Sequence, residues 1–387
     1  MKTGLFILSI FCFSNSFSQN KIPLDFYVKT IDSLPYLEYG IGEDRLGGAK
    51  MTFLDSNIIL KVVDSFGTDY KVQLSQFHSA WINKKSVLKT QVFIPQQHLT
   101  GSWKIYGDSL FDYVTILLDQ KLPYKSVQEI HPSRIVVDVF GATSNTNWIN
   151  QLSSAKEIKN AWYEQTEDDV MRIIIELKHP QHWGYSIFYD SLSKLTIRVK
   201  RQPSILNLKN LTVAIDAGHG GTNIGATGVK TRIKEKDYTL LIARQLEKEL
   251  LLKKTRVVLT RTKDTTLSMP ERIHLLKQKN PDLLISIHLN SASADSVQGV
   301  STYYRYIGFR PLAESILKNV LKTRLKEFGN IGSFNFALSG PTDYPNCLVE
   351  VAFLSNEDDE RKILNPKFRS AVAKRIVEGI EDFLKKL

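Results

Sequence analysis

Two histidines stand at the ends of apolar runs that are predicted to be buried strands. His219 follows the run 214–217, and His288 closes the run 283–288. Because the carboxyl ends of neighbouring parallel strands meet at one edge of a sheet, we expect these imidazoles to lie close together. Glu235 opens a helical pattern between them, and Glu350 interrupts a later apolar strand. Two imidazoles, one carboxylate ligand and a spare carboxylate are the components of a hydrolytic zinc centre.

These four residues divide naturally into ligands and a proton carrier. A catalytic zinc takes three nitrogen or oxygen ligands from the protein, which His219, Glu235 and His288 would supply. A carboxylate outside the ligand set must then move the proton of the attacking water, and Glu350 is predicted to do so. A buried carboxylate without a compensating partner would be costly in an apolar strand, so its presence there suggests a role. Cys347 lies on the opposite face of the same strand and is predicted to fill the core.

The other histidines show no spacing typical of metal ligands. A single histidine at a strand end is most often structural, so the prediction rests on the combination of two histidines with two glutamates. Gly218, Gly220 and Gly221 would permit a tight turn beside the metal, and their spacing matches no phosphate-binding loop. The histidines interpreted as structural or surface residues are His78, His98, His131, His179, His182 and His274.

The pattern from residue 211 onward predicts the scaffold of this site. Apolar strands alternate with helical stretches, which favours an α/β domain with a largely parallel sheet flanked by helices. Helices are predicted over 235–252 and 367–387. Ser268 with Glu271 forms a capping box at the start of another helix.

Residues before 200 favour β structure instead. Short alternating runs with turn signals predict a small β-barrel-like module over 35–95 and a second β module over 100–200. The first 18 residues, with a basic start and an apolar stretch, predict a secretory signal. No later segment approaches the roughly 20 apolar residues of a membrane span. We therefore expect an exported protein without a transmembrane segment.

Charge narrows the classes of partner only slightly. The chain of 387 residues carries a formal net charge of +11. For an exported protein, a basic surface suits an anionic polymer such as cell wall, although it equally suits simple solubility. Nucleic acid is not expected as a partner, because no run of Lys and Arg is interleaved with aromatic residues.

The C-terminal part resembles a known enzyme family. Residues 211–387 are similar to the zinc-dependent N-acetylmuramoyl-L-alanine amidases of bacterial cell walls, which implies zinc ligands at His219, Glu235 and His288 and a catalytic carboxylate at Glu350. Two positions depart from the family pattern, with Asn223 in place of an aspartate and Ala352 in place of a glycine. The resemblance rests on the segments 216–221, 235–236, 260–264, 286–290 and 348–356.

The two β modules also resemble known domains. Residues 100–200 are similar to the AMIN domain found ahead of exported amidases, and 35–95 to bacterial relatives of Src-homology barrels. For both modules, binding to the cell wall, contact with a cell-envelope localisation partner and a plain β scaffold without a ligand stay open. The predicted organisation is a signal peptide at 1–18, modules at 35–95 and 100–200, and a catalytic domain at 208–387.

The predicted function is hydrolysis of the amide between N-acetylmuramic acid and the L-alanine of the stem peptide in peptidoglycan, in the periplasm. Two alternatives remain, a zinc carboxypeptidase acting on stem peptides and a non-catalytic peptidoglycan-binding protein. Carboxypeptidases usually place the first histidine and glutamate three residues apart, whereas His219 and Glu235 are 16 apart (235 − 219). A decoy would be expected to lose a ligand or the base, and this chain keeps all four residues.

Overall fold

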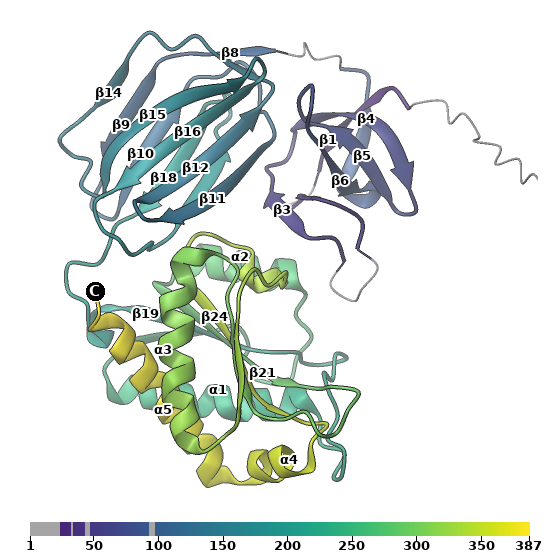
Figure 1. Ribbon diagram of the computed structural model, residues 1–387, viewed down its shortest axis with the longest axis vertical. Helices are drawn as coiled ribbons and strands as arrows, with labels where there is room; N and C mark the ends of the chain where they lie inside the picture. Colours follow the sequence, from purple (N-terminus) through teal and green to yellow (C-terminus); the bar gives the residue numbers. More distant parts are fainter. Residues whose placement is uncertain (1–23, 32–33, 43–46, 93–96) are drawn as a thin grey trace, which may run out of the picture.

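The computed structural model describes residues 24–31, 34–42, 47–92 and 97–387. Two β-rich modules lie side by side against one α/β domain (Figure 1). The predicted signal peptide at 1–18 lies outside the described residues. Among the described helices, none has the length and apolar character to cross a membrane.

The first module is one antiparallel sheet of seven strands in the order β3-β2-β6-β5-β4-β1-β7. Its strands alternate, so that one face buries side chains such as Val28, Val62 and Val72 while the other meets solvent. The sheet also takes in a strand ahead of the range predicted for this module. Its elements are β1 (Phe26–Thr30), β2 (Tyr36–Glu38), β3 (Lys50–Phe53), β4 (Ile59–Phe66), β5 (Asp69–Gln73), β6 (Ser79–Asn83), η1 (Lys84–Ser86) and β7 (Val87–Thr90).

The second module contains sheets of five, four and two strands. Near-continuous apolar strands, such as β12 and β16, place their side chains in a core shared with the first module. The expectation of two mainly-β modules is confirmed. The strands are β8 (His98–Thr100), β9 (Trp103–Gly107), β10 (Phe111–Ile116), β11 (Tyr124–Ile130), β12 (Ser133–Phe140), β13 (Ala142–Ser144), β14 (Ile149–Gln151), β15 (Ile158–Glu167), β16 (Val170–Leu177), β17 (Tyr185–Tyr189) and β18 (Leu195–Lys200).

The C-terminal domain is built on a six-stranded sheet in the order β20-β19-β21-β24-β22-β23. Strands β20, β19, β21 and β24 are parallel, and β22 runs antiparallel to β24. This confirms the largely parallel sheet. The strands are β19 (Thr212–Ala217), β20 (Arg256–Leu259), β21 (Leu283–Asn290), β22 (Val300–Tyr303), β23 (Glu327–Ile331) and β24 (Asn346–Phe353).

Helices α1, α3 and α5 cover one face of this sheet (Figure 1), whereas α2 packs on the other face against Ala214 and Leu284. The predicted capping box is present, since Ser268 accepts from the Glu271 amide and Glu271 accepts from the Ser268 amide. The helical elements are η2 (Leu208–Asn210), α1 (Glu235–Leu252), α2 (Met269–Lys279), η3 (Ile307–Phe309), α3 (Arg310–Val320), η4 (Leu321–Thr323), η5 (Ala337–Ser339), α4 (Glu357–Leu364) and α5 (Pro366–Leu384).

Candidate metal centre

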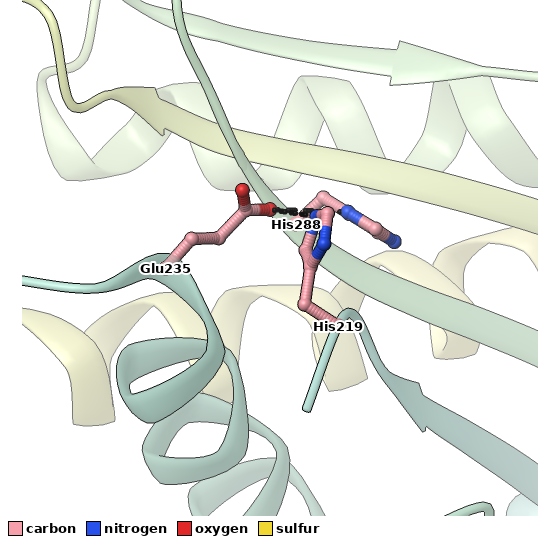
Figure 2. Close-up of side chains that lie close together, drawn as sticks. All are labelled: His219, Glu235 and His288. Atoms are coloured by element: carbon pink, nitrogen blue, oxygen red, sulfur yellow. Dashed lines mark hydrogen bonds and ion pairs between the residues drawn. The ribbon is translucent and has the colours of Figure 1, made fainter. Parts of the chain in front are cut away.

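Three predicted ligands converge at the carboxyl ends of β19 and β21. The ligand atoms of His219, Glu235 and His288 all lie within 4.8 Å of one another. His219 follows β19, His288 lies in β21, and Glu235 is the first residue of α1. The two strands are parallel neighbours, with Ala217 opposite Ile287, which brings the two imidazoles to the same edge. Figure 2 shows the Glu235 carboxylate pointing toward both rings.

His219 is held in a defined tautomer by Asn223. The His219 Nδ1 lies 2.9 Å from Asn223 Oδ1, and the Gly225 amide also donates to this oxygen. Because the amide oxygen only accepts, Nδ1 carries the proton and Nε2 presents its lone pair to the centre. That Nε2 lies 3.1 Å from Glu235 Oε1. The departure from aspartate at position 223 therefore preserves the acceptor that orients this histidine.

The backbone around His219 adopts conformations that favour small residues. His219 itself has φ of 60°, and Gly220 and Gly221 follow with φ of 132° and 56°. At Gly218, an added Cβ would lie 2.4 Å from the His288 ring. These glycines therefore let the turn bring one imidazole against the other.

The Glu235 carboxylate is fixed by backbone donors. The Leu289 amide donates to Oε1 at 2.9 Å, and the Ala226 amide donates to Oε2 at 2.7 Å. Burial opposes ionisation, but hydrogen bonds and charge from His219 and His288 outweigh it and hold the pKa of Glu235 below its usual range. The positive end of α1 favours the same charged form. Glu235 is thus kept in the anionic form that a metal ligand requires.

His288 is the most enclosed member of the group. Its Nδ1 lies 3.1 Å from Glu235 Oε1, and within the described residues its buried Nε2 has no hydrogen-bond partner. Burial disfavours the charged ring, but the hydrogen bond and charge of Glu235, with the charge of Glu350, raise the pKa of His288. β21 continues to Asn290, so His288 does not end the strand as the sequence predicts.

The donor set fits zinc. Two imidazoles and one carboxylate are the nitrogen and oxygen ligands that a catalytic zinc takes, with a further position left for water. A buried ring nitrogen without a partner and a carboxylate kept ionised are features that a cation would satisfy. Among the described residues, this is the one cluster of three such side chains.

Glu350 lies beside the cluster on β24. The parallel register of β21 and β24 places Glu350 opposite His288, so both side chains project from the same face of the sheet. Glu350 is half-buried. Cys347 points into the core under the helices, where burial raises the pKa of its thiol. The prediction that Cys347 fills the core is confirmed.

Two residues that hold the site in place were not identified from the sequence. The fully buried Arg272 donates to Asp216 Oδ1 at 2.6 Å and to the His219 carbonyl at 2.6 Å, which fixes the turn after β19. The ring of Phe336 lies edge-on to His288 with centroids 5.4 Å apart. Arg272 looks like an ordinary helix residue in the sequence, and Phe336 belongs to a loop without a motif.

Five of the six remaining histidines lie in the β modules, where several pair with single acceptors. His78 contacts Glu167, His98 contacts Asp119, and His179 contacts Glu157. Each pair lacks a third ligand of the kind found at the C-terminal cluster. The structural interpretation of these histidines agrees with that arrangement.

Two parts of the chain match models of known protein families. Residues 213–382 match the family described as N-acetylmuramoyl-L-alanine amidase. The C-terminal domain is therefore similar to that family over nearly its whole length. Residues 103–199 match the AMIN domain family, which confirms the resemblance of the second module. The matched region contains the whole cluster of His219, Glu235 and His288, with Glu350 beside it.

Curated relatives and solved structures match the same region. The protein named "Probable cell wall amidase LytH" from Staphylococcus saprophyticus is 30% identical over 192 residues, which are 49% of this chain and 64% of that protein. Its namesake from Staphylococcus aureus is 30% identical over 175 residues, 45% and 58% of the two chains. The chain therefore spans about three fifths of the length of these relatives.

Among solved structures, the catalytic domain of CwlV, an N-acetylmuramoyl-L-alanine amidase from Bacillus (Paenibacillus) polymyxa, is 33% identical with a TM-score of 0.44. The match covers 45% of this chain and 98% of that one. An N-acetylmuramoyl-L-alanine amidase from Clostridium difficile 630 is 32% identical with a TM-score of 0.44, covering 45% and 97%.

Proposed function

We propose that this chain is a zinc-dependent N-acetylmuramoyl-L-alanine amidase acting on peptidoglycan. The observation that carries the proposal is the convergence of His219, Glu235 and His288 inside an amidase-family domain. The scissile bond is the amide between the lactyl group of N-acetylmuramic acid and the L-alanine of the stem peptide.

The chemistry divides between the ion and the chain. When bound by His219, Glu235 and His288, zinc would supply a Lewis acid that polarises the carbonyl and lowers the pKa of water. Glu350 would accept one proton from the attacking water and deliver it to the departing amine. The water oxygen then forms the new carbon–oxygen bond of the lactyl carboxylate as the carbon–nitrogen bond breaks, releasing a stem peptide with a free L-alanine amine.

The surroundings of the domain support an extracytoplasmic role. The similar staphylococcal proteins are named cell wall amidases, and an AMIN domain precedes the catalytic domain here. We propose export through the predicted signal and action in the periplasm. The net charge of +11 would favour an anionic envelope polymer. The N-terminal modules would provide contacts to a localisation partner in the envelope.

The deciding experiment is digestion of purified peptidoglycan by the chain without its predicted signal, followed by mass spectrometry of the products. We expect stem peptides beginning with L-alanine, and we expect a chelator to abolish their release and added zinc to restore it. Release of terminal stem-peptide residues alone would favour a carboxypeptidase. Binding to the wall without any release would favour a non-catalytic protein.

A further inference from the structure

A loop of the catalytic domain lies between the candidate site and the first β module. This loop, residues 332–340, is named here the Phe336 loop. On the other side stands the N-terminal hairpin, the part of the first module formed by residues 36–42 and 47–53 with strands β2 and β3. Contacts between the two join segments almost 290 residues apart in the chain.

Asn335 is the centre of these contacts. Its Nδ2 donates to the Gly48 carbonyl at 2.7 Å, and its Oδ1 accepts from the Lys50 amide at 3.1 Å. The same Oδ1 accepts from Arg305 Nη1 at 3.3 Å, and Arg305 Nη2 donates to the Lys50 carbonyl. One amide side chain thus bonds two backbone groups of the N-terminal hairpin and one arginine of its own domain.

Apolar packing strengthens the same junction. Phe53 of the hairpin packs against Leu338 and Tyr344 of the catalytic domain in one core. An added Cβ at Gly340 would lie 2.7 Å from the Phe53 ring. The hairpin therefore contacts the Phe336 loop at two places, at Asn335 and at Gly340.

Beyond Asn335, the loop reaches the candidate metal ligands. The residues on either side of Asn335 are aromatic, and the rings of Phe334 and Phe336 stack with centroids 6.1 Å apart. Phe334 packs on Tyr303 at 4.5 Å, and Phe336 lies edge-on to His288 at 5.4 Å. A continuous series of contacts therefore runs from the N-terminal hairpin through Asn335 to His288.

We propose that Asn335 is a positioning residue through which the N-terminal hairpin holds Phe336 against His288. The inference rests on the proposed amidase function for its catalytic consequence only. The first β module would then form part of the active-site wall in addition to any role in localisation. Turnover would depend on a contact between the catalytic domain and a segment outside it.

The physical reason is the freedom of the loop. Its ends are tied within the catalytic domain, where the Phe334 amide donates to the Tyr304 carbonyl at 3.1 Å and Tyr306 Oη donates to the Gly340 carbonyl at 2.7 Å. Between these ends, the Ser339 amide donates to the Phe336 carbonyl at 3.1 Å and Leu338 is buried. Asn335 adds the fixed point on the other side of Phe336, toward the N-terminal hairpin. A half-buried phenyl ring that loses this point can move off the imidazole, and small misplacements of a reacting group cost large factors in rate.

The test uses variants of the full chain that cut the contact from each side. N335L removes the hydrogen bonds of the Asn335 side chain at similar side-chain size, and N335D keeps the acceptor oxygen. K50P removes the Lys50 amide hydrogen from β3, an edge strand where proline is tolerated. K50A is its matched control, since it removes the same side chain and keeps the amide. N330A controls for substitution on the adjacent strand β23, where Asn330 bonds Thr302.

Hydrogen exchange of the Phe336 loop is the first readout, because it needs no activity. We expect faster exchange of residues 332–340 in N335L and K50P, with K50A and N330A unchanged and N335D intermediate. The second readout is hydrolysis of a soluble muramoyl peptide by the zinc-loaded chain. We expect kcat of N335L to fall about tenfold while KM changes less than about twofold.

Each outcome decides the inference. Wild-type exchange and wild-type kcat in N335L would overturn it, and so would equal losses in K50A and K50P, which would assign the effect to the lysine side chain. Faster exchange with unchanged kcat would overturn the positioning role. If the wild-type chain hydrolyses no muramoyl amide, the proposed function fails, and hydrogen exchange of residues 332–340 still decides whether Asn335 fixes the loop.

Discussion

The two β modules meet the catalytic domain in different ways. The second module contacts segments that precede the strands, where Lys200 donates to the Pro281 carbonyl and Tyr185 donates its amide to the Thr342 carbonyl. Lys200 also pairs with Asp282 at 2.9 Å. His288 lies six residues beyond Asp282, about 20 Å along a strand. The first module contacts the Phe336 loop, which touches His288 directly.

This difference indicates that the influence of a β module on the candidate metal site depends on which segment of the catalytic domain the module contacts. The second module buries large groups in the catalytic domain, including Trp183, which is 2% exposed and packs near Phe383. The first module contacts the Phe336 loop, and Phe336 in turn lies against His288, a candidate zinc ligand. The contact between the second module and the catalytic domain is called here the second interface. We expect substitutions at the second interface to alter stability, and substitutions at the candidate metal site and in the Phe336 loop to alter turnover.

The largest effects are expected at the site itself. E350A should bind zinc normally and lose turnover by at least about a thousandfold, because no group remains to carry the proton. H288A should lose both zinc and turnover. Isothermal titration with zinc and product analysis on peptidoglycan check the pair. Turnover near the wild-type level in E350A would assign proton transfer to another group.

A large effect on stability without an effect on catalysis is expected at the second interface. W183A should lower the free energy of unfolding by about 3–5 kcal/mol, because it opens a cavity where the second module joins the catalytic domain. The kcat of the folded, zinc-loaded fraction should stay unchanged.

Denaturant melts of W183A are best compared with W148A. Trp148 is 64% exposed, and its substitution should change stability by less than about 0.5 kcal/mol. A lowered kcat in folded W183A would mean that the second module also shapes the site, which would remove the contrast between the two interfaces.

A smaller effect is expected at the orienting residue of His219. N223A should weaken zinc binding by about 10–100-fold, because the acceptor that fixes the His219 tautomer is lost. N223D keeps an acceptor and should bind zinc at least as tightly as the wild type. A competition titration with a chromogenic chelator measures both, with N207A at a distant exposed position as the control. Unchanged affinity in N223A would show that the ring needs no support.

The smallest effect is expected at Asp343, at the second interface. Burial raises the pKa of this carboxyl, although Lys277 and Arg198 oppose the shift. A raised pKa in the folded state means that stability is fully present below the unfolded value and is lost as the pH rises through the folded value. D343N should therefore have a slightly higher Tm than the wild type at neutral pH, and the difference should disappear near about pH 4. The opposite trend in thermal melts would assign net stabilisation to the charged form.

Local patterns predicted much of the catalytic domain. The start of α1 at Glu235, the capping box at Ser268 and the parallel strands carrying His219 and His288 follow from periodicity and capping, which depend on neighbouring residues. Glu350 was detectable because a charge in an apolar strand is unusual. The extension of β21 past His288 was missed, because a histidine followed shortly by Asn290 and Ser291 resembles a strand end.

Long-range contacts could not be predicted in this way. Asn335 lies in a loop without regular spacing, and its partners Gly48 and Lys50 contribute backbone groups that any sequence would offer. Arg272 likewise depends on the fold, since its partner Asp216 is 56 residues away. Such contacts form when elements far apart in the sequence pack together, and no periodic pattern in the sequence predicts them.

The position of β3 has one more consequence. β3 is the last strand of the first sheet, bonded to β2 on one side only, and an uncovered strand of this kind can add a strand from another molecule. Asn335 and Arg305 bond the amide and carbonyl of Lys50 on the side of β3 that faces away from β2. The catalytic domain thus shields the sheet of its neighbour from intermolecular β-pairing, and the junction that reaches the active site also protects the chain against aggregation.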